Sequence, residues 1–234
     1  MGKKIILLKL TGTIFSTYEK KSTDNPIARS ILSQIKQLSS TYQFGIVIGG
    51  GNFFRGSEQS AELGITASIA HHVGMLATIM NGLILKDLCD QLDIPARLLS
   101  ALTIPAIAES ASPHAIASAL KQNHLLIFSG GTGNPFFTTD TCSVLRALEI
   151  GADELWKGTY VEGICDKDPR KNKDATVLHS ISYKEALDQK LCVMDLTAFT
   201  LAEKHKLPIR IFNIFCENAL VNAARDKNFG SIIS

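Results

Sequence analysis

Short apolar runs alternate with amphipathic segments along most of this chain, and this alternation constrains the fold more than any other feature. Strands that alternate with helices build a largely parallel sheet that is covered on both faces. The 234 residues, 45% of them hydrophobic, suffice for a sizeable core. The sequence therefore predicts an open, mostly parallel α/β fold with helices on both faces, a three-layer sandwich. Strands are expected near 4–10, 44–48, 96–100, 124–128 and 153–157, and helices near 26–40, 70–91, 113–122 and 139–151.

The last third of the chain is organised differently. A charged, proline-containing stretch at 166–174 precedes helices expected near 182–191 and 195–205 and a strand at 209–212. The charged stretch suits a solvated loop, and its position also suits a lid over a ligand. At the first helix, the polar Asn25 before Pro26 is expected to act as the cap.

Two glycine-rich turns each follow a short apolar run directly. Residues 49–56 read GGGNFFRG and residues 130–140 read GGTGNPFFTTD. The carboxyl edge of an open α/β sheet is where ligands bind, and successive backbone N–H groups there suit phosphate oxygens. Glycines also serve tight turns without any ligand. Two long turns favour two anionic groups, although neither turn fits a P-loop or a dinucleotide fingerprint.

Composition limits the partners. The 24 basic and 22 acidic residues nearly cancel, and no basic cluster is interleaved with aromatic residues, so a nucleic-acid partner is not expected. Five irregularly spaced cysteines indicate reduced thiols in the cytoplasm, and no metal site is identified. The basic start at residues 3–10 is expected as a strand rather than a leader, and no apolar stretch is expected to span a membrane.

Two cations are candidates for holding an anion. Lys9 interrupts an apolar strand and should emerge at its end, facing an anion or carboxylate, or else reach water as an edge lysine. Arg55 follows the first turn, where its guanidinium could hold a phosphate through two hydrogen bonds or form a surface salt bridge.

Polar residues also gather where the helix expected at 139–151 begins. Thr138, Thr139 and Asp140 suit helix capping, and the same groups could bind an acceptor phosphate while Asp140 orients Lys9. The adjacent pair His71 and His72 is poorly arranged for chelating one metal, because neighbouring helical residues point in different directions.

With these features in view, the chain resembles the bacterial UMP kinases of the amino-acid kinase superfamily over nearly its whole length. The segment 131–140 is highly specific to that family. The other matching segments are 8–12 (LKLTG), 47–56 (VIGGGNFFRG), 74–81 (GMLATIMN), 166–169 (DKDP) and 193–195 (VMD).

The resemblance implies a single amino-acid kinase-like domain over 1–234, with an acceptor-binding lobe at about 1–150 and an ATP-binding lobe at about 151–234. It implies ATP-dependent phosphorylation of UMP in pyrimidine biosynthesis, Mg²⁺ supplied as MgATP, a homohexamer, and GTP and UTP as effectors. By resemblance, ATP would contact Lys9, Leu10, Thr11, Gly12, Gly51, Arg55, Thr159, Cys165 and Asp168. UMP would contact Gly50, His71, Thr132, Gly133, Asn134, Pro135, Phe136, Phe137, Thr138 and Thr139, and the catalytic group would be Lys9, Arg55 and Asp140.

The chain departs from the family pattern at several nucleoside contacts. His71 stands where the family has an aspartate on the UMP sugar, and an imidazole cannot accept hydrogen bonds from both ribose hydroxyls. Thr13 and Ile14 replace a usual Glu-Ala pair, an arginine is missing from 65–70, and Cys165 replaces an aromatic residue. Two alternatives therefore remain: a kinase with another acceptor, and a non-catalytic nucleotide-binding regulatory oligomer.

Overall fold

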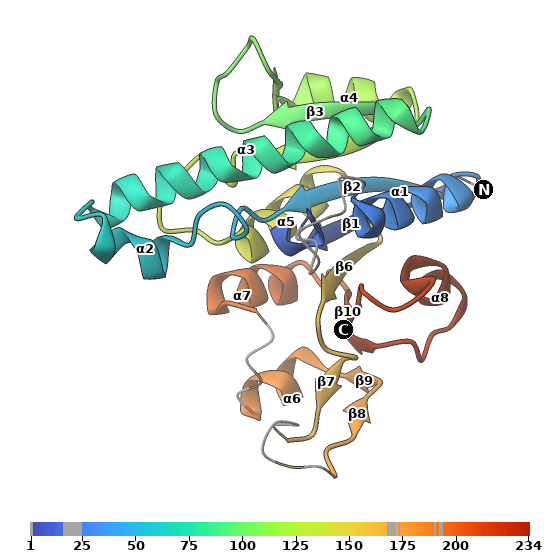
Figure 1. Ribbon diagram of the computed structural model, residues 1–234. Helices are drawn as coiled ribbons and strands as arrows, with labels where there is room; N and C mark the ends of the chain where they lie inside the picture. Colours follow the sequence, from blue (N-terminus) through green and yellow to red (C-terminus); the bar gives the residue numbers. More distant parts are fainter. Residues whose placement is uncertain (1, 16–24, 168–171, 173, 190, 192–193) are drawn as a thin grey trace.

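A nine-stranded sheet forms the centre of the molecule within the residues that the computed structural model describes, which are 2–15, 25–167, 172, 174–189, 191 and 194–234 (Figure 1). The strand order is β4-β3-β5-β2-β1-β6-β10-β11-β9, and every pair is parallel except β10 with β11. The mostly parallel α/β sheet is therefore confirmed. The strands are β1 (Lys4–Leu10), β2 (Tyr42–Ile48), β3 (Ala96–Ser100), β4 (Glu109–Ser110), β5 (Leu125–Ser129), β6 (Glu154–Thr159), β9 (Ser180–Ile181), β10 (Ile209–Asn213) and β11 (Ser231–Ile233).

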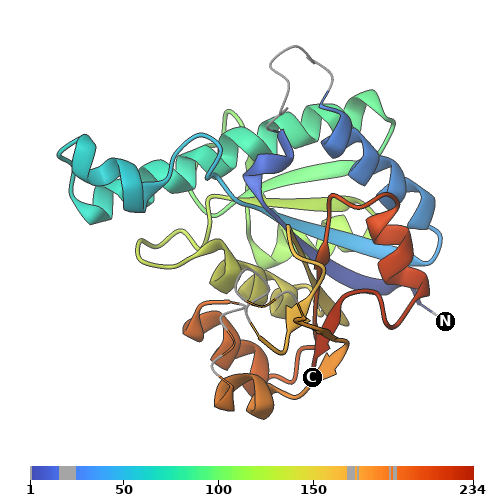
Figure 2. The same ribbon diagram turned by 60° about the horizontal axis from the view of Figure 1, so that its bottom comes forward.

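Helices cover both faces of this sheet. One face packs against α1 (Pro26–Leu38), α3 (Ala67–Gln91) and α8 (Ala219–Arg225). The other packs against α4 (Pro113–Lys121), α5 (Thr139–Glu149), α6 (Tyr183–Asp188) and α7 (Leu196–Lys204). Figure 2 shows α8 beside α1, where Gln34 Oε1 accepts a hydrogen bond of 2.9 Å from the Leu220 N–H. The two-layer covering is the one that alternating strands and helices predict.

Smaller elements complete the described chain. The 3₁₀ turn η1 (Gly12–Phe15) follows β1, and α2 (Gly56–Glu62) precedes α3, with which it extends away from the sheet (Figure 2). A separate antiparallel pair joins β7 (Ile164–Cys165) to β8 (Val177–Leu178). These elements and α8 are short or lack clear periodicity, so the sequence pattern did not indicate them.

Successive strand residues face opposite layers, which is why the strands read as continuous apolar runs. Leu7 packs in one core cluster, whereas its neighbours Ile6 and Leu8 pack in the other. On the Leu8 side, the rings of Trp156 and Phe212 meet edge to face, with centroids 6.0 Å apart and planes at 85°. Burial on both faces leaves polar strand residues conspicuous, and Lys9 is one of them.

Two expectations from the sequence were wrong. Helix α1 does begin at Pro26, but Asn25 has φ 42° and its side chain makes no capping hydrogen bond. The expectation that no apolar stretch reaches membrane-spanning length also fails, because α3 is long and apolar enough by length and composition, with a mean hydropathy of 1.4. That window is 44% buried inside the protein, and core helices of soluble proteins pass the same test.

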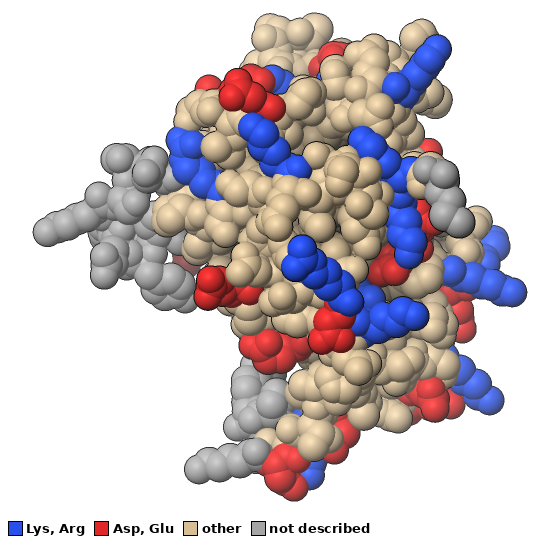
Figure 3. Space-filling model, turned by 90° about the vertical axis from the view of Figure 1, so that its right-hand side faces the viewer, with Lys and Arg blue, Asp and Glu red and all other residues tan. Residues whose placement is uncertain are grey.

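On the side of the molecule that Figure 3 shows, basic and acidic side chains are interspersed over the surface. Lys86 and Asp90 form an ion pair, one turn apart on α3, with side-chain exposures of 28% and 60%. Exposed pairs of this kind contribute roughly 0–1 kcal/mol each. Buried charges have a larger energetic weight. In the described chain they are Arg146, which pairs with Glu149, Arg210, and the largely buried group at the end of β1.

Arg210 fastens the C-terminal loop to the sheet. It is 4% exposed, and its Nη1 donates to the carbonyl oxygens of Asp226, Lys227 and Phe229 at 3.1–3.3 Å. Its Nε lies 3.5 Å from Glu154 Oε2. One guanidinium therefore satisfies three loop carbonyls that the sheet does not pair.

We predict that Arg210→Met lowers the free energy of unfolding by about 2–4 kcal/mol, because the carbonyls and the carboxylate lose their partner. Arg210→Lys should recover little, since one ammonium cannot reproduce the fork of donors. Urea unfolding measures both, with the exposed Arg225→Met as a matched control. A loss for Arg210→Met no larger than that of Arg225→Met would contradict this role.

Candidate functional site

The two glycine-rich turns meet at one edge of the sheet. Strands β2 and β5 are parallel neighbours, with Val47 opposite Phe128, so both turns begin at the same edge. A cavity of about 690 Å³ opens there. Its lining includes these residues from the predicted set: Lys9, Thr11, Gly12, Gly50, Gly51, Arg55, His71, Thr132, Asn134, Phe137, Thr138 and Thr139.

Close backbone approach is what requires glycine in the first turn. A Cβ on Gly50 would lie 2.8 Å from Ala77 Cβ and 2.9 Å from the Gly74 carbonyl oxygen of α3. A Cβ on Gly12 would lie 2.7 Å from the carbonyl oxygen of Gly49. These glycines therefore allow the first turn, η1 and α3 to approach one another closely. A simple reversal of the chain would not require this close approach.

A buried asparagine holds the first turn in place. Asn81 of α3 is 0% exposed, and its Nδ2 donates to the Gly49 carbonyl and to Asn52 Oδ1, both at 2.7 Å. The Asn52 amide donates back to Asn81 Oδ1 at 3.0 Å. The sequence did not predict this role of Asn81, because a polar residue in a helix does not reveal which turn it will contact.

The second turn is held by α3 as well. The N–H of Gly130 donates to Thr78 Oγ1 at 2.8 Å, and Thr78 is buried. Beyond it, Phe136 has φ 70° and a 66% exposed side chain. The His71 ring lies 4.9 Å from the Phe136 ring, centroid to centroid. His71 thus stands on α3 at the mouth of the cavity, against the second turn.

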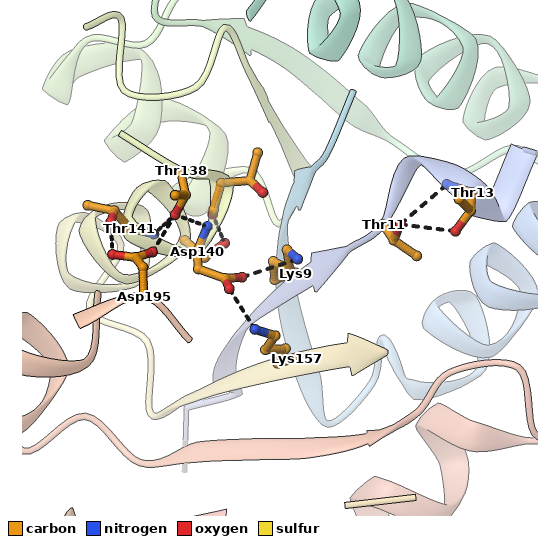
Figure 4. A network of polar contacts seen from close by, with 10 residues as sticks. Lys9, Thr11, Thr13, Thr138, Asp140, Thr141, Lys157 and Asp195 are labelled. Atoms are coloured by element: carbon orange, nitrogen blue, oxygen red, sulfur yellow. Dashed lines mark hydrogen bonds and ion pairs between the residues drawn. The ribbon is translucent and has the colours of Figure 1, made fainter. Parts of the chain in front are cut away.

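The start of α5 is capped as the sequence predicts. Thr138 Oγ1 accepts hydrogen bonds from the N–H groups of Asp140 and Thr141, at 3.1 and 3.2 Å. Both threonine hydroxyls also donate to the carboxylate of Asp195, which in turn caps α7 by accepting from Ala198 N. One carboxylate therefore ties two helix N-termini together, as Figure 4 shows for the three labelled side chains.

Asp140 lies between two lysines (Figure 4). Its Oδ1 is 3.1 Å from Lys9 Nζ, and its Oδ2 is 2.6 Å from Lys157 Nζ. The three side chains are only 12–17% exposed. Lys9 and Lys157 are register partners on the adjacent strands β1 and β6, which explains why the two side chains lie close together.

The predicted pairing of Lys9 with Asp140 is therefore present, and Lys157 is the residue that the sequence analysis missed. The signal was available, since Lys157 also interrupts an apolar strand. Only the register of β1 with β6 identifies the lysine as a second partner of Asp140.

Burial and charge act in opposite directions on this group. Burial alone raises the pKa of Asp140, but Lys9 and Lys157 outweigh it and hold that pKa below its ordinary value of 3.8. Burial lowers the pKa of Lys157, and Asp140 opposes that effect while Lys9 adds to it. With one carboxylate and two ammonium groups, the cluster carries a net positive charge that a bound anion would neutralise.

Arg55 is bound to the turn that it follows. Its Nε donates to the Gly51 carbonyl at 3.2 Å, and Arg55 is the residue before α2. The side chain lines the cavity together with Lys9. The geometry is compatible with the predicted contact to a phosphate.

Some predicted residues do not line the cavity. Leu10 is buried in the core, where its carbonyl accepts from Gly49 N at 3.0 Å, and Asp140 lies behind Lys9. Gly133, Pro135 and Phe136 belong to the second turn but are not part of the lining. Thr159 ends β6, Cys165 lies on β7, and Asp168 is outside the described residues. The adenosine contacts therefore stay a prediction.

A preformed protein metal cage is not found in the part of the chain that the structure describes. No group of three or more His, Cys, Asp or Glu side chains there is placed to hold a metal ion. Both oxygens of Asp140 already face ammonium groups. A divalent ion would need most of its ligands from a bound phosphate compound and from water.

Comparison with known proteins places this geometry in a family. Residues 4–213 match the model of the amino acid kinase family. The chain is 43% identical to the uridylate kinase of Serratia proteamaculans (strain 568) over 98% of its own length and 95% of that protein. It is 42% identical to the uridylate kinase of Yersinia pestis (strain Pestoides F), with the same coverage.

Solved structures agree with these relatives. The UMP kinase from Ureaplasma parvum superimposes with a TM-score of 0.94 at 34% identity, covering all of both chains. The UMP kinase from Bacillus anthracis gives 0.92 at 30% identity, covering 99% of this chain and 96% of that one.

We predict that Asp140→Asn lowers the free energy of unfolding near neutral pH by roughly 2–4 kcal/mol, because two buried ammonium groups lose their anion. The folded-state pKa of Asp140 is depressed, so its contribution is full above 3.8 and is lost as the pH falls through the lower folded value. The difference between wild type and variant should therefore shrink in acid. Urea unfolding from pH 7 to pH 3 measures it, and a difference that does not change with pH would contradict an electrostatic role.

Proposed function

Because this chain belongs to the amino acid kinase family and, within it, to the uridylate kinases, we propose that it transfers the γ-phosphoryl group of ATP to UMP, giving UDP and ADP. The observation that carries the proposal is the Lys9–Asp140–Lys157 cluster at the meeting point of two glycine-rich turns. Two anionic nucleotides need two phosphate sites, and the two turns supply backbone donors for both.

Positioning and charge neutralisation account for the reaction. The phosphate of UMP is largely ionised at neutral pH, so its oxygen can attack without a general base. Lys9 and Arg55 would balance charge on the transferring group, and Asp140 would keep Lys9 and Lys157 pointed at it. Gly50 and the segment 132–139 would hold UMP, while 10–12 and Gly51 would hold the phosphates of ATP.

Mg²⁺ would enter as MgATP. The described residues offer cations and backbone donors rather than a carboxylate cage, which fits an ion held mainly by phosphate oxygens. When bound, the ion would neutralise charge on the β- and γ-phosphates. The protein's own part would be to hold Lys9 and Arg55 around the same phosphates, while Lys157 binds Asp140.

The proposed division into two lobes would run through this cluster. Residues 1–150 would form the acceptor-binding lobe, which carries Lys9 and Asp140, and residues 151–234 the ATP-binding lobe, which carries Lys157. Thr159, Cys165 and Asp168 would line the adenosine site in the second lobe. The ion pair between Asp140 and Lys157 crosses this boundary, which supports a single amino-acid kinase-like domain in which the lobes work as one unit.

An oligomer would also explain an apolar face of α3. Ile69, Leu76, Met80 and Leu83 are 46–51% exposed, and they repeat at helical spacing along one side. We propose a homohexamer in which this side of α3 meets a second copy. GTP as activator, UTP as inhibitor, a cytoplasmic location and a place in pyrimidine biosynthesis are further parts of the proposal.

The direct test measures ADP release with Mg²⁺ and ATP, comparing UMP with CMP, dUMP, GMP and AMP. We expect a strong preference for UMP, and Lys9→Met should lower kcat by about 10²-fold or more while the variant stays folded. Faster turnover with a different monophosphate would show that this compound, and not UMP, is the acceptor. Nucleotide binding without any turnover would favour a regulatory binding protein.

His71 permits a separate test of the acceptor site. We expect His71→Asp to tighten UMP binding, because a carboxylate can accept from both ribose hydroxyls and an imidazole cannot. Calorimetry measures the affinity, with His72→Asp as the control on the neighbouring residue. An unchanged or weaker affinity for UMP would argue against a sugar contact at residue 71.

The oligomer is tested by sedimentation. Leu76→Glu combined with Met80→Glu should reduce the assembly to smaller species, since two charges would be placed in an apolar contact. Leu187→Glu, on the exposed surface of α6, is the control and should leave the mass unchanged. A wild-type protein that sediments as a monomer would refute the hexamer.

A further inference from the structure

Three hydroxyl groups form a chain from the end of β6 to the edge of the cavity. The Tyr160 hydroxyl, directly after β6, donates to Thr13 Oγ1 in η1. Thr13 Oγ1 lies 3.0 Å from Thr11 Oγ1, and the N–H of Thr13 also donates to Thr11 Oγ1 at 3.4 Å. Figure 4 shows the two threonines just beyond the end of the strand that carries Lys9. Thr11 and Thr13 line the cavity.

The hydrogen bonds allow this chain to run in one direction. Each hydroxyl has one proton to donate and two lone pairs that accept. Either threonine hydroxyl can donate in the contact between Thr13 and Thr11. In the orientation in which Thr13 donates, Thr11 Oγ1 accepts from both the hydroxyl and the N–H of Thr13, and the Thr11 proton is left to donate to a ligand. When all hydrogen bonds of a chain point in the same direction, they polarise one another, so the last hydroxyl becomes a stronger donor.

The Tyr160 ring is held so that its hydroxyl can start this chain. It stacks on Phe215, with centroids 4.5 Å apart and planes at 14°. Phe215 packs against the core, and its N–H donates to Asn213 Oδ1 at 3.0 Å. A ring that is 51% exposed would otherwise sample several rotamers. The stack therefore restrains the Tyr160 ring in the position from which its hydroxyl reaches Thr13.

We propose that Tyr160 and Thr13 are positioning residues that present the Thr11 hydroxyl as a donor to a phosphate oxygen of ATP. The inference rests on the proposed function for the identity of the nucleotide. It concerns this chain in particular, because residue 13 is a threonine where the resembling family has glutamate. A glutamate there would be ionised near neutral pH and could accept from Tyr160 but could not donate onward to Thr11.

The test removes single hydroxyls and leaves the packing intact. Tyr160→Phe keeps the stacked ring, Thr13→Val keeps the shape, and Thr13→Ser keeps the hydroxyl. We expect Tyr160→Phe and Thr13→Val each to weaken the affinity for a non-hydrolysable ATP analogue by about three- to tenfold, the range of one neutral hydrogen bond. The double variant should be no weaker than either single one, because both changes break the same chain.

The controls separate positioning from folding. Thr13→Ser should restore wild-type affinity, the melting temperatures should stay close to that of wild type, and KM for UMP should not change. Tyr42→Phe removes a hydroxyl that bonds the Ala224 carbonyl, and it should leave nucleotide affinity unaltered. Effects that multiply in the double variant, a Thr13→Ser variant that behaves like Thr13→Val, or unchanged affinity in Tyr160→Phe would each overturn the proposal.

The readout also distinguishes failure of this inference from failure of the proposed function. Nucleotide affinity is measured without UMP, so the hydroxyl chain is tested even if UMP is not the acceptor. If the wild-type protein binds the analogue but does not phosphorylate UMP, the proposed reaction is refuted. The affinities of the Tyr160 and Thr13 variants still test the hydroxyl chain in that case. Wild-type protein that binds no analogue would overturn both.

Discussion

Two lysines brought side by side by a parallel sheet are the constraint on which the site depends. The register of β1 with β6 sets Lys9 opposite Lys157, and both side chains are largely buried. Like charges at such a distance destabilise the fold unless an anion separates them. Asp140 supplies that anion from the first turn of α5, so the start of this helix must lie over the ends of both strands. The capping of α5 by Thr138, and the bond from Thr138 to Asp195, then follow as the means of fixing Asp140.

The same constraint explains why the site suits anionic ligands. The Asp140 carboxylate neutralises one of its two partners, and the depressed pKa of Asp140 keeps it ionised near neutral pH. The remaining positive charge is close to Arg55 and to two turns of backbone donors. A phosphoryl group would replace water around these donors at low reorganisation cost, because the sheet already holds them in place. Chemistry between two phosphates needs this arrangement more than it needs an acid or a base.

Local pattern was enough to predict the sheet, most of its helices and the edge at which the turns meet. The apolar runs and the 3.6-residue periodicity each depend on neighbours in sequence, and the lysine at the end of β1 was visible as an interruption. The sequence did not show which residues the buried polar groups would contact. Lys157, Asn81 and Arg210 each contact residues far away in sequence, and only strand register or helix placement selects those contacts. The cap predicted at Asn25 was wrong for a local reason. Asn25 is a residue type that favours capping, but here it has a left-handed backbone conformation and its side chain makes no capping hydrogen bond.

Two separate links join the C-terminal third of the chain to the surroundings of the cavity, one through Lys157 and Asp140 and one through Tyr160 and Thr13. Both start from residues 157–160, so the sheet positions both links. The departures at His71 and Cys165 lie outside these links. The residues proposed to contact a nucleoside can therefore change while Lys9, Arg55 and Asp140 keep their geometry. For this reason the choice of acceptor and the phosphoryl transfer itself have to be tested with different variants.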